Sequence, residues 1–195
     1  MHGVARPRSS LDEGELDAPT IARAVGGDRE ASRALVERYQ RRVFALVSRM
    51  LAGRGRPTIE DAAQDTFLQV FSRLASFDPD GPARLSTWIL TIAARRAIDE
   101  LRKMRPTVLA EIERTSDARG DERAIRRELI AAIEVALREL SPPLRAAFLL
   151  REYHDLDYAE IATALDIDVG TVKSRLSRAR AALREQLAAL HEGAR

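Results

Sequence analysis

Cationic residues gather in one short stretch near the end of the chain. The sequence GTVKSRLSRARAAL, residues 170–183, contains four Lys or Arg residues and no acidic one. On a helix drawn through it, one narrow stripe is apolar: Val172, Leu176, Ala179 and Leu183. Ser174 and Ser177 lie on the opposite side between the long cationic side chains, so that side could approach a polyanion closely. A solvated helix surface is the more usual meaning of clustered cations, and the stretch alone does not decide between the two.

The residues just before this stretch supply the other half of a two-helix motif. Asp157 with Glu160 three residues later is typical of a capping box at the start of a helix. Asp168 can cap the basic helix, and the interval 166–170 is short enough for one tight turn. Two short helices joined in this way predict a helix-turn-helix, whose second helix enters the major groove of DNA. The start of that helix is expected to point free backbone N–H groups at a phosphate.

The composition argues against most other kinds of site. The chain has no cysteine, which removes disulfides, thiolate metal sites and cysteine nucleophiles, and its three histidines lack metal-ligand spacing. No nucleophile-elbow, P-loop or dinucleotide-binding pattern is present, so we expect neither an enzyme, nor a metal, nor a cofactor. The net charge of +2 is too small to indicate nucleic-acid binding by itself. Without a signal peptide or a long apolar run, we expect a cytoplasmic protein.

Apolar periodicity predicts an all-α chain with two small helical domains joined by a flexible acidic linker. The expected segments are a disordered tail at 1–17, a first domain at 18–105, the linker at 106–124 and a helix-turn-helix domain at 125–190. Within the first domain we expect helices at about 28–52, 58–74 and 86–103. The helix at 86–103 and its C-terminal flank form a second basic element.

The helix expected at 58–74 has two faces of different character. Its predicted buried residues are Ala63, Phe67, Val70, Phe71 and Leu74. The other face presents Asp61, Gln64, Asp65 and Leu68 at i, i+3, i+4 and i+7. Carboxylates and an amide beside an apolar side chain suit a partner with basic residues, whereas an ordinary solvated face is the plainer interpretation.

These segments resemble a known family. LSPPLRAAFLLREYHDLDYAEIATALDIDVGTVKSRLSRARAALRE is similar to region 4 of bacterial sigma-70 family sigma factors of the extracytoplasmic-function (ECF, group 4) type. EDAAQDTFLQVF and STWILTIAARRAIDELRK resemble regions 2.2 and 2.3 to 2.4 of the same factors. The resemblance spans about 20–105 and 129–187 and implies a subunit that binds core RNA polymerase. Such a subunit recognises the −35 and −10 promoter elements, helps to melt the −10 element and so directs transcription initiation.

The resemblance also implies roles for individual residues. The polymerase-binding residues would be Asp61, Gln64, Asp65 and Leu68. The −35 residues would be Thr171, Lys173, Ser174, Arg175, Ser177 and Arg178, with the question of which arginine reads a base left open. The −10 residues would be Arg84, Trp88, Arg95, Arg96 and Arg102. A lone tryptophan on a helix is more often a core residue than a stacking platform, so Trp88 has both interpretations.

Three residues depart from the family pattern. Arg95 stands where the family often has asparagine, which puts the inherited base preference at that position in doubt. Asp166 and Asp168 stand where glycine and proline are frequent in the turn. Because aspartate can cap a helix or adopt left-handed backbone geometry, the motif should survive these changes.

The implied partners are core RNA polymerase (its β′ clamp helices and β subunit), promoter DNA and an anti-sigma factor. We expect the free chain to be a monomer with no membrane insertion. The linker resembles the segment that threads the polymerase channel, although a simple tether is equally supported. One alternative is a free-standing dimeric helix-turn-helix regulator, for which the chain offers no obvious dimer seam. Another is a protein-interaction module, which would leave the acidic face of the 58–74 helix unexplained.

Overall fold

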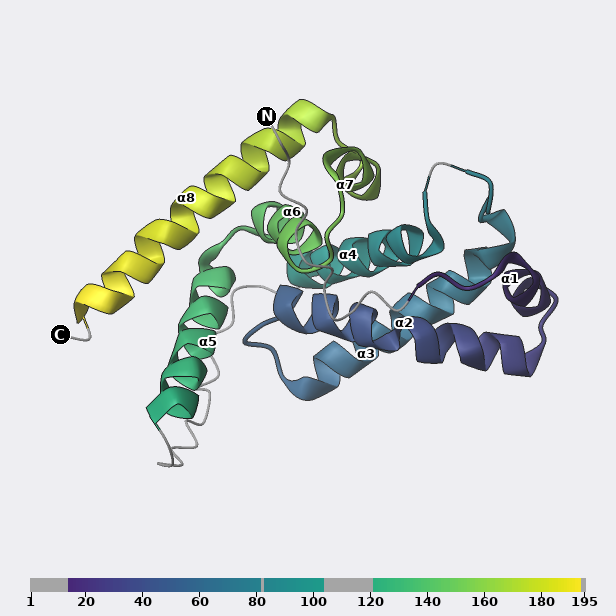
Figure 1. Ribbon diagram of the computed structural model, residues 1–195, viewed down its shortest axis with the longest axis horizontal. Coiled ribbons are helices and arrows are strands. Elements are labelled where there is room, and N and C mark those ends of the chain that lie inside the picture. The colour runs from purple at the N-terminus through teal and green to yellow at the C-terminus, as the bar shows by residue number, and fades with distance from the viewer. Residues whose placement is uncertain (1–13, 82, 104–120, 194–195) are drawn as a thin grey trace.

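The computed structural model describes residues 14–81, 83–103 and 121–193, and every regular element in these ranges is a helix (Figure 1). The first half contains α1 (Ala18–Val25), α2 (Arg29–Met50), α3 (Arg56–Arg73), a single 3-10 turn (Leu74–Ser76) and α4 (Leu85–Lys103). The second half contains α5 (Asp121–Glu139), α6 (Pro142–Glu152), α7 (Tyr158–Leu165) and α8 (Val169–Gly193). The all-α prediction is confirmed.

The starts of α1 and α2 follow from local chemistry. Asp17 caps α1 by accepting a hydrogen bond from the backbone N–H of Thr20 at 2.7 Å. Asp28 caps α2 in the same way, through Ala31 N at 2.8 Å. Between the two helices Gly27 adopts φ 83°, a left-handed conformation that glycine takes without strain. The helix predicted to begin near 28 therefore begins within one residue of that position.

The core of the first half lies between α2, α3 and α4. The apolar face predicted for α2 is buried as expected: Leu35, Tyr39, Val43, Leu46, Val47 and Met50. The burial predicted for the α3 segment is confirmed for Val70 and Leu74. Elsewhere it was wrong by about one residue, because Ala62 and Thr66 are buried while Ala63, Phe67 and Phe71 are only partly buried. Thr66 is tolerated inside because its hydroxyl donates to the Ala62 carbonyl at 2.7 Å, which satisfies the polar group within the helix.

Helix α4 packs on α2 and α3 on one side and on α6 and α7 on the other (Figure 1). Its burial is accordingly wider than one stripe and includes Leu85, Ser86, Thr87, Leu90 and Ala94. The buried apolar residues of both halves form one continuous cluster, which runs from α1 to α8. The two helical units expected from the sequence are thus in direct contact in this structure.

Arg145 of α6 connects the ends of two other helices, α2 and α5. It is only 5% exposed, and it donates to the carbonyls of Met50 at the end of α2 and of Arg138 and Leu140 at the end of α5. The last carbonyls of a helix have no partner within the helix, so a guanidinium with several donors can satisfy them together. Burial lowers the pKa of Arg145 to about 10, which leaves it charged at neutral pH.

The chain joins the fold slightly before the expected domain start at 18. The Glu15 carboxylate accepts hydrogen bonds from the Tyr39 hydroxyl at 2.9 Å and from the backbone N–H of Ser86 at 3.1 Å, and also from the Ser86 hydroxyl. A side chain 71 residues away thus caps the start of α4. Residues 1–13 of the expected tail and 106–120 of the expected linker lie outside the described residues, while 121–124 belong to α5.

Candidate nucleic-acid interface

The helix-turn-helix is built as its sequence predicts. In the capping box of α7, Asp157 Oδ1 accepts from the Glu160 backbone N–H and Glu160 Oε2 accepts from the Asp157 backbone N–H, each at 2.8 Å. Helix α7 ends at Asp166, whose φ of 55° is the left-handed geometry otherwise taken by glycine. Asp168 then caps α8 through Thr171 N at 2.7 Å. Asp166 and Asp168, the two turn residues that differ from the family pattern, are therefore compatible with a helix-turn-helix.

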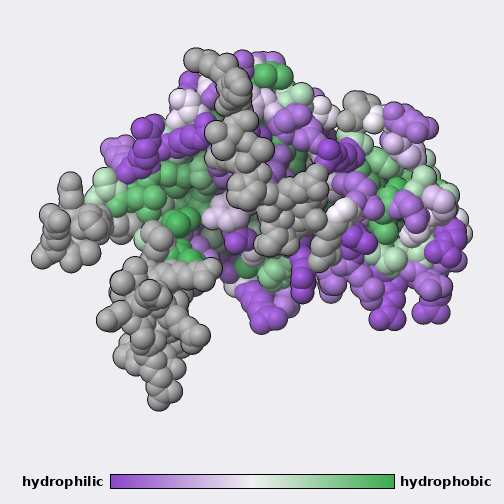
Figure 2. Space-filling model, in the orientation of Figure 1, coloured by the Kyte–Doolittle hydropathy of each residue, from purple (hydrophilic) through white to green (hydrophobic). Residues whose placement is uncertain are grey.

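Helix α8 presents opposite surfaces to the protein and to solvent. Val172, Leu176, Ala179 and Leu183, the predicted stripe, are buried. Figure 2 shows hydrophilic side chains along the outer side of α8 and hydrophobic ones on the side that faces α5. The exposed basic residues Lys173 and Arg178 thus remain on the side that DNA could reach.

Three cations near the start of α8 have no acidic partner among the described residues: Lys173, Arg175 and Arg178. Lys173 and Arg178 are exposed, and Arg175 is half-buried. By contrast, Arg180 forms an ion pair with Glu152 at 2.7 Å and is turned toward the protein. Uncompensated cations on one helix face create the positive potential that attracts a phosphate backbone.

The polar groups at the start of α8 are largely engaged. The Thr171 hydroxyl donates to Asp168 at 2.5 Å, and the Ser174 hydroxyl donates to the Thr171 carbonyl at 2.9 Å, whereas Ser177 is exposed. The N–H groups of Thr171 and Val172 bond to Asp168, so the expectation of free N–H groups at this helix start was wrong for these two. The hydrogen bonds from Thr171 lower the pKa of Asp168, which keeps it negative.

The predicted −10 residues do not share one environment. Arg84 is exposed in the loop before α4, and Arg102 is an exposed residue that pairs with Asp99 on its own helix at 3.7 Å. Trp88 is half-buried, with its ring centroid 5.5 Å from that of Phe77 in a tilted arrangement. That contact makes Trp88 part of the packing that holds Phe77, near the end of the 3-10 turn, against α4.

Arg95 and Arg96 both have protein partners. Arg96 forms an ion pair with Asp65 of α3 and lies 3.8 Å from Glu100. Asp65 was assigned to the polymerase surface and Arg96 to the −10 surface, so the structure links these two predicted sites directly. Arg95 instead reaches α7, where its Nε donates to the Ala164 carbonyl at 3.1 Å.

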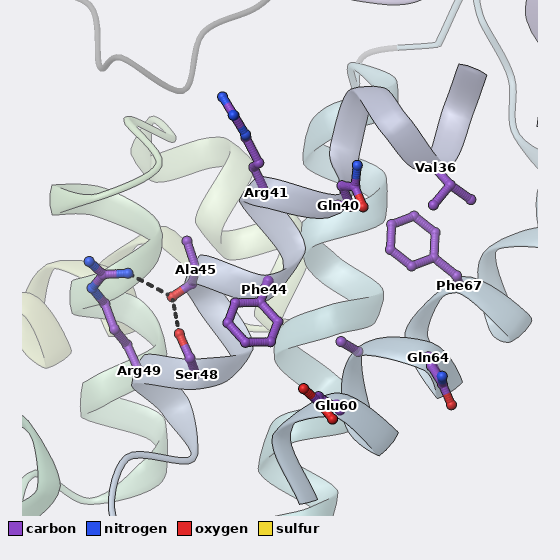
Figure 3. Close-up of a pocket in the computed structure, with 11 residues that line it drawn as sticks. Val36, Gln40, Arg41, Phe44, Ala45, Ser48, Arg49, Glu60, Gln64 and Phe67 are labelled. Carbon is purple, nitrogen blue, oxygen red and sulfur yellow. Dashed lines mark hydrogen bonds between the residues drawn. The ribbon is translucent and has the colours of Figure 1, made fainter. Parts of the chain in front are cut away.

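A groove between α2 and α3 adjoins the predicted polymerase surface (Figure 3). Its apolar lining is Val36, Phe44, Ala45, Ala63 and Phe67, and its polar rim includes Gln40, Arg41, Arg49, Glu60 and Gln64. Phe44 is 43% exposed and Leu68, on the outer face of α3, is 67% exposed. Asp61 and Gln64 are exposed as predicted, which leaves an apolar groove with polar edges.

Sequence reasoning missed the α2 side of this groove. Val36, Gln40 and Phe44 follow at i, i+4 and i+8 on α2, directly beside its buried stripe of Leu35, Tyr39 and Val43. A phenylalanine outside the predicted buried stripe of α2 was the available signal, because a large exposed apolar side chain often marks a contact surface.

Within the described part of the chain, no cluster of three or more acidic or histidine side chains is arranged to hold a metal ion. In the same ranges no helix is long and apolar enough to cross a membrane.

Comparison with known proteins gives the family of this chain. The family model "Sigma-70 region 2" matches residues 35–107, and the model "Sigma-70, region 4" matches residues 130–183. The RNA polymerase sigma-H factor of Pseudomonas aeruginosa is 33% identical over 186 residues, which cover 89% of this chain and 94% of that protein. The ECF RNA polymerase sigma factor SigW of Bacillus subtilis is 32% identical over 174 residues, which cover 83% and 91%.

A solved structure agrees with these matches. The structure described as CnrH in complex with the cytosolic domain of CnrY superposes with a TM-score of 0.65 and is 28% identical, over 88% of this chain and 96% of that one. The chain belongs to the ECF class of the sigma-70 family of RNA polymerase sigma factors. Nothing in the comparisons supports the alternative of a dimeric regulator, and membership of this family agrees with the expectation that the chain is not itself an enzyme.

Proposed function

We propose that this ECF sigma factor directs RNA polymerase to promoters by dividing recognition between its two helical halves. Helix α8 contacts the −35 element, and α4 with the loop before it contacts and helps to melt the −10 element. The groove between α2 and α3 binds core polymerase. The observation that carries the proposal is the uncompensated cationic face of α8, held on a correctly capped helix-turn-helix.

The arginines and the lysine of α8 are suited to different contacts with DNA. An arginine can donate two parallel hydrogen bonds to the O6 and N7 atoms of guanine, whereas a lysine acts mainly as a point charge toward phosphate. We assign Arg175 and Arg178 to base or phosphate contacts within the groove and Lys173 to phosphate. Thr171 and Ser174 stabilise the first turn of α8, since their hydroxyls form hydrogen bonds with Asp168 and with the Thr171 carbonyl.

Core polymerase would bind the groove between α2 and α3 and the outer face of α3. Phe44 and Leu68 provide exposed apolar area, and Asp61 and Gln64 provide acidic and amide groups that suit basic residues of the β′ clamp helices. Ile130 and Val135, 48% and 37% exposed on α5, are suited to an apolar contact with the β subunit.

An anti-sigma factor is proposed as a third partner. The solved relative that is 28% identical is described with the cytosolic domain of a second protein bound. In the free chain the α2–α3 groove is open to such a partner, which would compete with core polymerase for it. This assembly would act where bacterial core polymerase works, in the cytoplasm.

Binding measurements test whether core polymerase and the −35 element bind separate surfaces. Leu68→Asp is expected to weaken binding to core polymerase without changing the melting temperature, because Leu68 is mostly exposed. Val25→Asp is the matched control, since Val25 is also an exposed apolar residue, 46% exposed, but lies on α1 away from the groove. Arg175→Ala/Arg178→Ala should keep core binding and lose −35 protection in a footprint. Equal loss of core binding in Leu68→Asp and Val25→Asp would refute the proposed polymerase surface.

A further inference from the structure

The N-cap position of α4 is occupied by a residue that cannot cap a helix. The Arg84 carbonyl accepts the first hydrogen bond of the helix, from the backbone N–H of Trp88 at 3.0 Å, which makes Arg84 the N-cap residue. An N-cap side chain normally accepts a hydrogen bond from the second or third helical N–H, but an arginine side chain carries donors only. Its positive charge is also unfavourable at the positive end of the helix dipole.

Glu15, which precedes α1, supplies the missing acceptor. Its Oε2 accepts from the backbone N–H of Ser86, the second residue of α4, at 3.1 Å, and its Oε1 accepts from the Ser86 hydroxyl. The bond to Ser86 N is the one that an N-cap side chain would make, and a carboxylate suits the positive end of the dipole. Because Ser86 is only 4% exposed, removal of Glu15 would take the acceptor from two buried donors.

Tyr39 of α2 fixes the position of Glu15. The Tyr39 hydroxyl donates to Glu15 Oε2 at 2.9 Å and accepts from the backbone N–H of Leu16 at 3.2 Å. Burial raises the pKa of Tyr39 well above its usual value, so this hydroxyl keeps its proton at neutral pH. Glu15 is thus bonded to both α2 and α4, although it is an exposed residue whose removal would open no cavity in the core.

The first turn of α4 determines how the loop before it is presented to DNA. Arg84, one of the proposed −10 residues, is exposed at the end of this loop, and its carbonyl is held by Trp88. Phe77, at the other end of the loop, packs against the ring of the same Trp88. Because Glu15 caps α4, the helix start is ordered without use of the Arg84 side chain. A contact that is ordered in advance costs less conformational entropy when DNA binds.

We propose that Glu15 is a positioning residue for the −10 contact. By capping α4 from outside the helix, it holds the first turn of α4 and Arg84 in place for the melted strand. Glu15 acts through α4 and does not itself contact the DNA. The consequence for the promoter rests on the proposed function, whereas the cap is a property of the free chain.

Hydrogen exchange on the free chain tests the cap. Glu15→Ala should lower the protection of the Ser86 backbone amide roughly fivefold, the factor to which loss of one helix cap typically corresponds. Glu15→Gln keeps one acceptor oxygen and should be intermediate. Asp17→Ala is the matched control, because Asp17 is a nearby acidic residue that caps α1 through Thr20. Equal protection of the Ser86 amide in Glu15→Ala and Asp17→Ala would overturn the cap.

Promoter melting with core polymerase tests the positioning role. Permanganate reactivity of unpaired thymines reports melting at the −10 element, and footprinting reports protection at the −35 element. Glu15→Ala should reduce −10 melting by up to about the same fivefold factor and keep core binding and −35 protection. Asp17→Ala should match the parent in all three measurements. In an Arg84→Ala background, Glu15→Ala should have a smaller effect on melting, because a residue that it positions is already missing.

Two results would overturn the positioning role: −10 melting by Glu15→Ala equal to that of the parent, or an equal loss of melting in Asp17→Ala. These outcomes differ from failure of the proposed function. If the parent itself melts no promoter, the proposed function is refuted, and hydrogen exchange still decides whether Glu15 caps α4. If the parent melts promoters and Glu15→Ala melts them equally well, the positioning role is refuted and the proposed function stands.

Discussion

Removal of the Arg145 side chain should destabilise the protein strongly. Arg145→Ala would leave the Met50 and Leu140 carbonyls buried without this donor, and the partly buried Arg138 carbonyl would lose a bond as well. An unsatisfied buried polar group costs about 1–3 kcal/mol, so the two buried carbonyls alone predict a loss of about 2–6 kcal/mol. For a chain of this size, a loss of about 4 kcal/mol corresponds to a decrease of roughly 8–16 °C in melting temperature.

Urea unfolding followed by circular dichroism measures this loss. Arg145→Lys keeps the charge but cannot reach three carbonyls with a planar fork, so it should be intermediate. Arg33→Ala is the control: Arg33 is an exposed arginine whose ion pair with Glu37 lies at the surface, and its removal should leave stability unchanged. A loss below about 1 kcal/mol for Arg145→Ala would show that water or neighbouring groups replace its hydrogen bonds, and the reasoning would be wrong.

Three further predictions concern pH, salt and the recognition helix. Burial, with Arg42 and Arg49 nearby, lowers the pKa of His154 from 6.5 to about 3, so the folded form requires the neutral ring. The free energy of unfolding is therefore fully retained above pH 6.5 and falls as the pH drops from 6.5 toward 3, by about 1 kcal/mol for each pH unit. His154→Leu should abolish this loss in urea titrations, and an unchanged pH dependence in that variant would contradict the reasoning. Lys173→Ala should lower the salt slope of promoter binding by about 0.9 on a log–log plot with little change in sequence preference, whereas a changed base preference would refute its assignment to phosphate. Asp168→Asn should keep the backbone amide of Thr171 protected from hydrogen exchange, because asparagine can still cap α8. Asp168→Ala should lose that protection. Equal protection of the Thr171 amide in the two variants would refute the cap.

Local chemistry made the helix-turn-helix predictable. The capping box of Asp157 and Glu160, the cap at Asp168 and the left-handed Asp166 depend on residues within a few positions of one another, so spacing was enough to expect them. The buried stripe of α8 was predictable for the same reason, since it follows one helical period.

Tertiary partners could not be predicted from spacing. The buried side of α3 includes Thr66, which the sequence analysis did not place in the core. A threonine can be buried there because its hydroxyl bonds within its own helix, whereas its polar residue type alone suggested an exposed position. Asp65 and Arg96 were assigned to separate surfaces, and only the packing of α3 on α4 brings them together. The contact of Arg95 with α7 joins residues 69 positions apart, for which one sequence gives no signal.

The central claim is that this chain gives core RNA polymerase its choice of promoter. The most direct measurement is transcription from a genomic DNA library by purified core polymerase with and without the chain, with start sites mapped by sequencing. The account predicts new start sites that share two spaced upstream elements, which disappear with Leu68→Asp and change or disappear with Arg175→Ala/Arg178→Ala. Unchanged start sites, together with tight binding of the free chain to duplex DNA as a dimer, would contradict it.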